Sequence, residues 1–324
     1  GGVIYEPMEL KLIEEQILFL QNLQTQGKSF NTVKNYKADL NCFNEFLASK
    51  QKNLKFKSFT TTQVNEYSQY LQEKYGSPNS IRRRVQALRL FFDYLILKGA
   101  FPENPLKKMP VAPKVLDLPR PTPFIQITKF YQYLQKDFKA AETSLAQCVA
   151  ARNLILFHLI YGTGLKVSDL AKITLSSVLK EKDGFRILVQ HPKRDPYSIP
   201  LPKLFNSDFK IYKDLYNKQM QLEDAQFDEL LFNANPYRMI SGGLSPRGTE
   251  LLFEEWRRKY KLEITAKSLR QSCIFKWLNQ KVNETTIKEW LGVAPNYTLE
   301  LYTNLLEKKP MDYVFSEMGG AHDS

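Results

Sequence analysis

The chain has 324 residues, which is long enough for two domains that each bury a core of their own. Its composition, with 43% hydrophobic and 25% charged residues, is ordinary for a folded soluble protein. The 46 Lys and Arg residues exceed the 34 Asp and Glu residues and give a formal net charge of +12, which indicates a polyanionic partner, nucleic acid before a membrane surface.

On charge alone, a solvated basic surface is an equally good alternative. The three cysteines, Cys42, Cys148 and Cys273, show neither metal-ligand spacing nor a disulfide framework, which favours a reducing cytoplasm. The most apolar run, residues 154–160, is too short to cross a bilayer, and the N-terminus lacks a signal-peptide pattern. We therefore expect a soluble cytoplasmic protein with no membrane partner and no metal or organic cofactor.

Apolar side chains at helical spacing predict a domain of four helices over residues 8–100, the first of them at 10–23. Thr60 and Gln63 have the spacing of a capping box, and Gly99 is a good helix terminator. The apolar stripes of the other three helices are Val33, Tyr36, Leu40, Phe43 and Leu47; Val64, Tyr67 and Leu71; and Ile81, Val85, Leu88, Phe92 and Leu95.

The polar face of the last of these helices is rich in arginine. Arg82 and Arg89 lie on one face with Gln86, beside Arg83 and Arg84, and the sequence shows little acidic compensation there. Guanidinium groups suit phosphate oxygens because each can pair with two of them. We favour nucleic-acid binding over a merely solvated helix face.

Residues 101–123 contain seven of the chain's 17 prolines. A helix cannot continue through such a segment, so we expect an extended, semi-rigid linker at a domain boundary. The second domain, residues 124–324, begins helical and then shows two strands, Phe185–Gln190 and Tyr197–Pro202, around a charged turn. Ser245 and Pro246 predict a helix start, so the fold class is mainly α with a small antiparallel β-sheet.

Several stretches resemble the tyrosine recombinases, the phage integrase and Xer family. "IYGTGLKVSDLAKITLSSV" (160–178) resembles the motif around that family's first catalytic arginine, and "WLGVAPNYTLELYTNLL" (290–306) resembles the segment that carries its nucleophile. "NTVKNYKADLNCFNEFL" (31–47) and "SIRRRVQALRLFFDYL" (80–95) look like its core-binding domain. The similarity covers nearly the whole chain in the same order and implies a two-domain DNA clamp.

The resemblance also implies a chemistry. In that family a tyrosine hydroxyl attacks a DNA phosphate and forms a 3′-phosphotyrosine, which conserves the bond energy for rejoining. Two arginines stabilise the charge that develops on the phosphate. A lysine on a strand turn protonates the leaving 5′ oxygen, and two further donors, usually His and then His or Trp, complete the proton transfer.

Three of these positions are filled by the expected residue types. The resemblance implies that Tyr302 is the nucleophile and that Arg270 is the second phosphate-binding arginine. The lysine of the turn corresponds to Lys193, with Arg194 as a competitor because the turn is shifted by a few residues. Taken singly, each of these residues also suits a structural role, Tyr302 as a packed aromatic and Arg270 in a salt bridge.

Three positions depart from the pattern. Lys166 replaces the first arginine and keeps its charge without the planar fork. Lys267 stands where the family usually has histidine, although some members have lysine there. Val293 replaces the last donor and offers none from its side chain, and Trp290 comes three residues too early.

We therefore predict a recombinase-like DNA-binding protein that is catalytically impaired or inactive, with an architectural or regulatory role in the nucleoid. An active, divergent site-specific recombinase using Tyr302 is the alternative, and a protein–protein module that has abandoned DNA is a third. The tail from Tyr313, with Val314 and Phe315, is predicted to dock on a second copy. The basic residues expected to contact DNA are Lys34, Lys37, Arg82, Arg83, Arg84, Arg89, Arg257 and Arg258.

Overall fold

The computed structural model describes residues 7–50, 59, 61–107, 118–235 and 239–318. The chain forms two compact units, with the boundary after Asp117. Most elements are helices, and the β-structure consists of two small antiparallel sheets, so the predicted fold class is confirmed.

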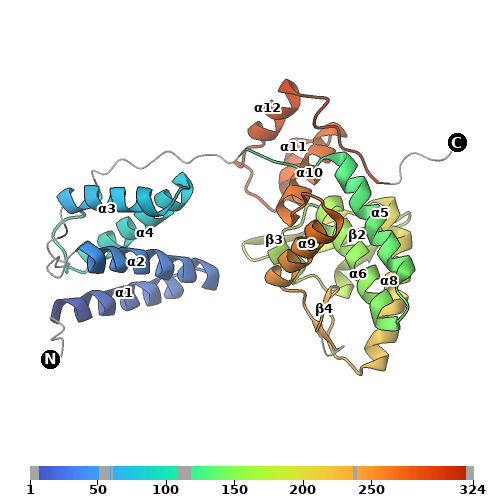
Figure 1. Ribbon diagram of the computed structural model, residues 1–324, viewed down its shortest axis with the longest axis horizontal. Coiled ribbons are helices and arrows are strands. Elements are labelled where there is room, and N and C mark those ends of the chain that lie inside the picture. Colours follow the sequence, from blue (N-terminus) through green and yellow to red (C-terminus); the bar gives the residue numbers. More distant parts are fainter. Residues whose placement is uncertain (1–6, 51–58, 60, 108–117, 236–238, 319–324) are drawn as a thin grey trace. The chain divides into compact units, whose positions relative to one another are not determined.

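Unit 1 is a bundle of four helices (Figure 1). The predicted apolar stripes are its core, since Leu40, Phe43, Tyr67 and Phe92 are all at most 1% exposed. The Thr60 cap lies outside the described residues, whereas Gly99, at φ +75°, follows the last helix as expected. The helices are α1 (Pro7–Thr25), α2 (Phe30–Lys50), α3 (Thr61–Lys74) and α4 (Pro78–Leu97).

The two ends of the proline-rich segment pack on different units. Phe101 and Leu106 are buried in the core of unit 1, where the Asn104 side chain donates to the Arg89 carbonyl at 3.1 Å. Thr122 is buried in unit 2, and its hydroxyl lies 2.7 Å from that of Ser268. Residues 108–117 lie outside the described part of the chain.

Unit 2 surrounds one large hydrophobic core, against which α5, α6 and α8 pack side by side (Figure 1). The three-stranded sheet has the order β1-β2-β3, and β4 pairs with β5. The elements are α5 (Phe124–Ala140), α6 (Ser144–Phe157), η2 (His158–Gly162), α7 (Val167–Leu170), η3 (Leu175–Ser177), β1 (Val178–Lys180), β2 (Phe185–His191), β3 (Arg194–Pro200), α8 (Lys203–Leu222), β4 (Phe232–Ala234), β5 (Ile240–Gly242), α9 (Pro246–Tyr260), α10 (Ala266–Asn279), α11 (Glu284–Trp290) and α12 (Glu300–Lys308).

Two local predictions in unit 2 are confirmed. Ser245 caps α9, because its hydroxyl accepts from the Gly248 amide at 3.0 Å, and Pro246 is the first helical residue. β2 and β3 form the predicted hairpin, with Val189 opposite Tyr197. β2 ends at His191 and β3 begins at Arg194, so both strands extend closer to the turn than the predicted ends at 190 and 197.

The helix formed by α6 and η2, Ser144–Gly162, is long and apolar enough by composition to cross a membrane. The apolar stretch is thus longer than the run at 154–160 suggested. However, 72% of its most apolar window is buried inside the unit, as expected of a core helix. Its hydrophobicity is explained by packing against α5 and α8.

The described part of the C-terminal tail packs on its own unit. Tyr313 stacks on Phe275 with ring centroids 4.7 Å apart, and Phe315 is 3% exposed. The Asn279 amide donates to the Tyr313 carbonyl at 2.5 Å. Of the two apolar residues expected to dock on a second copy, Phe315 is thus already buried in this chain, and Val314 is exposed.

Candidate active site

A hollow of about 540 Å³ in unit 2 brings together residues that are distant in sequence. It lies between the segment before α7, the middle of α9 and the start of α10. Three of the predicted site residues line it, namely Lys166, Lys267 and Arg270, and so does Arg257. The structure thus groups four cations around one cavity.

Arg270 connects two of the segments that line this hollow. It lies in α10, whose first turn is fixed by reciprocal bonds between Thr265 and Ser268. Its Nε donates to the Gly164 carbonyl at 2.7 Å, which holds the α10 side chain against the loop before α7. Burial lowers the pKa of Arg270, an effect opposed by Tyr302 and other nearby groups, and the guanidinium stays charged.

Lys166 contributes the second charge from the end of that loop. Its carbonyl begins α7 by accepting from the Asp169 and Leu170 amides, each at 3.0 Å. Partial desolvation and the adjacent Arg270 both lower the pKa of the Lys166 ammonium, while Asp169 opposes them. Two mutually repelling cations beside a cavity create a place where an anion is stabilising.

Lys267 is exposed in the first turn of α10. The amides at a helix N-terminus carry partial positive charge, so this turn adds to the attraction for an anion. The hollow is not purely basic, because Glu250 and Glu254 also line it. Arg247 lies 3.6 Å and 3.7 Å from their carboxylates and offsets part of their charge.

Tyr302 lies on α12 and is 8% exposed. Its ring packs on Phe275, with centroids 5.2 Å apart. Burial raises the pKa of Tyr302 to about 12, reinforced by Tyr297 and opposed by Arg270. The hydroxyl is therefore protonated at neutral pH and within electrostatic reach of Arg270, although Tyr302 does not line the hollow.

The β2–β3 turn places its two candidate cations differently. Lys193 is exposed, and its backbone amide donates to His191 Nδ1 at 3.0 Å. The Arg194 guanidinium donates to the Val293 carbonyl at 3.2 Å and to the Glu289 carbonyl at 2.9 Å. This favours Lys193 as the residue able to reach a ligand, because Arg194 is already bound to the loop after α11.

Val293 packs at the edge of the hydrophobic core and has no donor in its side chain. The nearby Trp290 does not take its place, since its ring packs against Trp277 with centroids 5.0 Å apart. Gly292, which immediately precedes Val293, has φ +69°, and a Cβ there would lie 2.5 Å from the Tyr197 hydroxyl. The loop is therefore pressed against β3 and needs glycine at this position.

The arginine-rich helix of unit 1 is less free than the sequence indicated. Asp39 of α2 is buried and accepts from Arg83 at 3.1 Å and 3.3 Å, so the expectation of little acidic compensation was wrong for Arg83. The Arg84 guanidinium lies 3.6 Å from the centre of the Tyr75 ring. The Asp39 pair was missed because its partners are far apart in sequence.

The other predicted DNA-binding residues fall into two groups. Lys34, Lys37 and Arg258 are exposed. Arg82 is half-buried and lines a hollow of about 430 Å³ between α2 and α4, while Arg257 donates to the Ile264 carbonyl at 2.8 Å. Arg89 is half-buried, and its carbonyl accepts from Asn104.

Sequence reasoning missed Asp169 and Tyr197. Asp169 interacts electrostatically with both Lys166 and Arg270. Tyr197 is buried on β3, and its pKa is raised by burial and by Asp169, while Arg194 and Arg270 lower it. Asp169 follows Lys166 by three residues, so helical spacing was an available signal for it; no comparable signal marked Tyr197.

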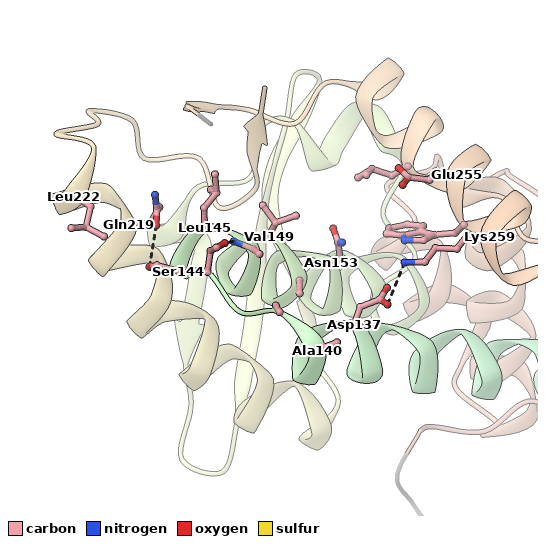
Figure 2. A pocket seen from close by; sticks show the side chains of 16 residues that line it. Asp137, Ala140, Ser144, Leu145, Val149, Asn153, Gln219, Leu222, Glu255 and Lys259 are labelled. Atoms are coloured by element: carbon pink, nitrogen blue, oxygen red, sulfur yellow. Dashed lines mark hydrogen bonds and ion pairs between the residues drawn. The ribbon is translucent and has the colours of Figure 1, made fainter. Parts of the chain in front are cut away.

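A larger hollow, of about 840 Å³, lies elsewhere in unit 2 between the ends of α5 and α8, the start of α6 and α9 (Figure 2). Its polar groups are largely engaged with one another: Lys259 lies 3.5 Å from Asp137, and Ser144 donates to Gln219 at 3.2 Å. None of the predicted site residues lines it. Size alone therefore does not identify the functional site.

Comparison with known proteins places both units in one group. Residues 126–309 match the model of the phage integrase family, and residues 17–99 match that of the phage integrase N-terminal SAM-like domain. Tyrosine recombinase XerA of Pyrococcus furiosus is 26% identical over 303 residues, covering 93% of each chain.

Two solved structures share the fold. The XerH site-specific recombinase bound to a palindromic difH substrate, in a post-cleavage complex, superimposes with a TM-score of 0.68 at 17% identity, covering 96% of this chain and 90% of that one. A lambda integrase dimer bound to a COC′ core site gives a TM-score of 0.61 at 14% identity, covering 98% and 85%.

Proposed function

Because the chain belongs to the phage integrase family, we propose that it binds duplex DNA and that its strand-cleaving activity is impaired. The observation that carries this proposal is the convergence of Lys166, Lys267 and Arg270 on one hollow. Such a group of cations suits a backbone phosphate. The exposed Lys34 and Lys37 of unit 1 add further phosphate contacts.

Two side chains account for the proposed impairment of strand cleavage. Lys166 supplies charge without the fork that binds two phosphate oxygens, and Val293 supplies no donor. Losing one preorganised donor typically costs roughly a hundred- to a thousand-fold in rate. The role that fits a retained scaffold with a weakened site is architectural or regulatory, on DNA in the cytoplasm.

A second function, slow site-specific strand exchange through a 3′-phosphotyrosine, is favoured by the position of Tyr302. The tyrosine interacts electrostatically with Arg270, which lines the hollow. A phosphate bound by Arg270 would come close to the Tyr302 hydroxyl. Lys193 would then protonate the leaving 5′ oxygen, and the covalent intermediate would conserve the bond energy.

Assembly with a second copy is part of the proposal. The lambda integrase of similar fold is a dimer on its core site. In this chain the tail already packs on its own unit through Phe315, so docking on a second copy requires the tail to leave that position. Sedimentation with and without duplex DNA tests this, and a monomer under both conditions at high concentration contradicts it.

The deciding experiment combines binding with covalent trapping. Fluorescence anisotropy of duplex DNA over a range of salt concentrations should give a steep log–log slope, because cations on the protein release counterions from the phosphates. A duplex affinity that does not change with salt concentration would exclude the DNA-binding functions and leave a protein–protein module as the remaining function. The protein is then incubated with nicked duplexes from its host genome and denatured in SDS.

The control for trapping is Tyr302→Phe, which keeps the packing on Phe275. Salt-sensitive binding with no adduct supports impaired cleavage. An adduct that forms with the wild-type chain and disappears with Tyr302→Phe establishes strand cleavage and overturns the impairment. Tyr297→Phe, a neighbouring tyrosine that is 43% exposed, controls for nonspecific loss.

A further inference from the structure

The β2–β3 hairpin and the loop after α11 are joined by one side chain, Arg194. Its Nη1 donates to the Val293 carbonyl at 3.2 Å and its Nη2 to the Glu289 carbonyl at 2.9 Å. Glu289 lies in the last turn of α11, where helix carbonyls carry partial negative charge, and Val293 lies in the loop three residues after the helix ends. A cation there binds more strongly than a neutral donor.

The guanidinium is also held in its own strand. It lies 4.6 Å from the centre of the Tyr197 ring, which is three positions further along β3. In the described part of the chain no carboxylate forms an ion pair with it. Its charge therefore acts on the helix end, on the loop and on Tyr197.

The loop is fitted to this pair of side chains. At Gly292 a Cβ would lie 2.5 Å from the Tyr197 hydroxyl and 3.6 Å from Arg194 Nη2. The Gly292 amide donates to the Glu289 carbonyl at 3.0 Å, so it shares its acceptor with Arg194. Arg194 and Tyr197 thus lie beside the loop that carries Val293, whose own side chain has no hydrogen-bond donor.

We propose that Arg194 is a positioning residue which fixes the Lys193 turn to the loop after α11 and so compensates for the missing donor at Val293. The inference rests on the proposed function, because it concerns the same phosphate site. Arg194 immediately follows Lys193, and the loop it holds leads to Tyr302. One side chain therefore sets the spacing between the two segments that carry a predicted acid and a predicted nucleophile.

The experiment is hydrogen exchange of the full chain, with and without duplex DNA, for wild type, Arg194→Gln and Arg194→Lys. Arg186→Gln is the matched control, since Arg186 on β2 also donates to a carbonyl, that of Ser198 at 2.9 Å, but does not reach the loop. In Arg194→Gln we expect the amides of Gly292 and Val293 and those of the turn to exchange roughly tenfold faster, because two charge-assisted hydrogen bonds are lost. Arg194→Lys should fall between, because it keeps the charge without the two-carbonyl contact.

A purely structural role is distinguished by the pattern of exchange and by rescue. A general loss of stability would raise exchange throughout the sheet, whereas loss of the contact raises it in two segments only. Val293→His in the Arg194→Gln background should restore duplex-dependent protection of the turn if the two positions share one task. In the wild-type background the same change should have little effect.

Failure of the inference and failure of the proposed function give different results. Unchanged exchange in Arg194→Gln, or a uniform increase, overturns the inference even if duplex binding is strong and salt-sensitive. A selective increase in the DNA-free protein, with no duplex binding by the wild type, keeps the contact between the segments but overturns both the proposed function and the role in it.

Discussion

The two basic regions of the molecule differ in what their cations already bind. In unit 1, Arg83 is paired with the buried Asp39, and Arg84 lies over the Tyr75 ring and donates to the Ser80 carbonyl at 3.1 Å. In unit 2, Lys166, Lys267 and Arg270 border one hollow, and the charge of Arg270 lowers the pKa of Lys166. The arginines of the first region are engaged by contacts within the protein, whereas no ion pair among the described residues involves Lys166, Lys267 or Arg270, with Asp169 the nearby acidic group that acts on Lys166 and Arg270.

This difference shows why a count of positive residues does not locate a binding site. A guanidinium paired with a buried carboxylate contributes little to the outward field, because the two charges largely cancel at a distance. A cation whose pKa is lowered by a neighbouring cation becomes more stable in its charged form when an anion binds beside it. The phosphate site is therefore expected in unit 2, and unit 1 is expected to act through its exposed lysines.

The strongest test of the comparison is Arg270→Gln. We expect the yield of any Tyr302 adduct to fall by at least roughly a hundred-fold, because a preorganised donor to the phosphate is lost. Duplex affinity should fall by roughly tenfold, because a side chain that lines the hollow no longer carries charge. Adduct gels and anisotropy measure the two effects.

Arg186→Gln again provides the control, since Arg186 is half-buried and bonded to a carbonyl but lies outside the hollow. Equal losses of affinity in both variants would contradict the assignment of the phosphate site to this cavity. Thermal unfolding should show a loss of stability in both, roughly 1.5 to 3 kcal/mol for each hydrogen bond from a charged guanidinium that is removed.

Lys166→Arg sharpens the comparison from the opposite direction. The lowered pKa of Lys166 means that its charge is lost at a lower pH than that of an ordinary surface lysine. Duplex affinity of the wild type should therefore begin to decline below the pH at which an ordinary lysine loses its charge, whereas arginine stays protonated there. The variant should lose this decline and bind more tightly at every pH.

The readout for Lys166→Arg is the difference in log affinity between wild type and variant as a function of pH, in which the titration of other groups cancels. Restoring the fork should also raise any adduct rate by about tenfold or more. A constant difference across the pH range would show that Lys166 keeps its charge and does not contact the phosphate.

Asp39→Asn tests the unit 1 side of the comparison. The pKa of Asp39 is raised, because burial outweighs the attraction of Arg83, so the charged form is disfavoured in the folded state. A carboxyl with a raised folded pKa contributes stability below its unfolded pKa of about 3.9 and loses it as the pH rises through the folded value. Near neutral pH the variant should therefore unfold with a free energy within about 1 kcal/mol of wild type.

The same change releases Arg83 for a phosphate. We expect duplex affinity to rise a few-fold and the salt slope to steepen by about 0.9, the value for one added phosphate contact. Asp93→Asn on α4 is a suitable control for a change of one charge. Weaker duplex binding by Asp39→Asn would indicate that the Asp39–Arg83 pair itself orients a DNA contact.

The helices and the hairpin were predictable because their signals are local. The spacing of Phe43, Tyr67 and Phe92 identified the core of unit 1, and Ser245 with Pro246 identified the start of α9. β4 and β5 escaped prediction because each has three residues, too few for a periodic pattern.

The grouping of residues at the candidate site was predictable only in part, and their chemical roles stay a prediction. The residue types of the site followed from motif resemblance, and Lys166, Lys267 and Arg270 do line one hollow. The contacts of Arg83 and Arg194 could not be inferred, because their partners are 44 and 95 or more positions away in sequence. Such partners are chosen by tertiary packing, which leaves no mark on local sequence.

The smallest predicted effect belongs to the double variant Lys34→Gln, Lys37→Gln. Both lysines are exposed on α2, and neither forms an ion pair within the residues that the structure describes. If each contacts one phosphate, the log–log salt slope should decrease by about 1.8, while sequence preference and adduct chemistry stay unchanged. Lys213→Gln, Lys218→Gln on α8, another pair of exposed lysines, is the matched control. Because long-range attraction depends on total charge, the control removes the same two charges, and only a difference between the two variants counts as contact. Equal slopes would mean that unit 1 draws DNA by its general field, and the contrast between the two basic regions would then be one of degree.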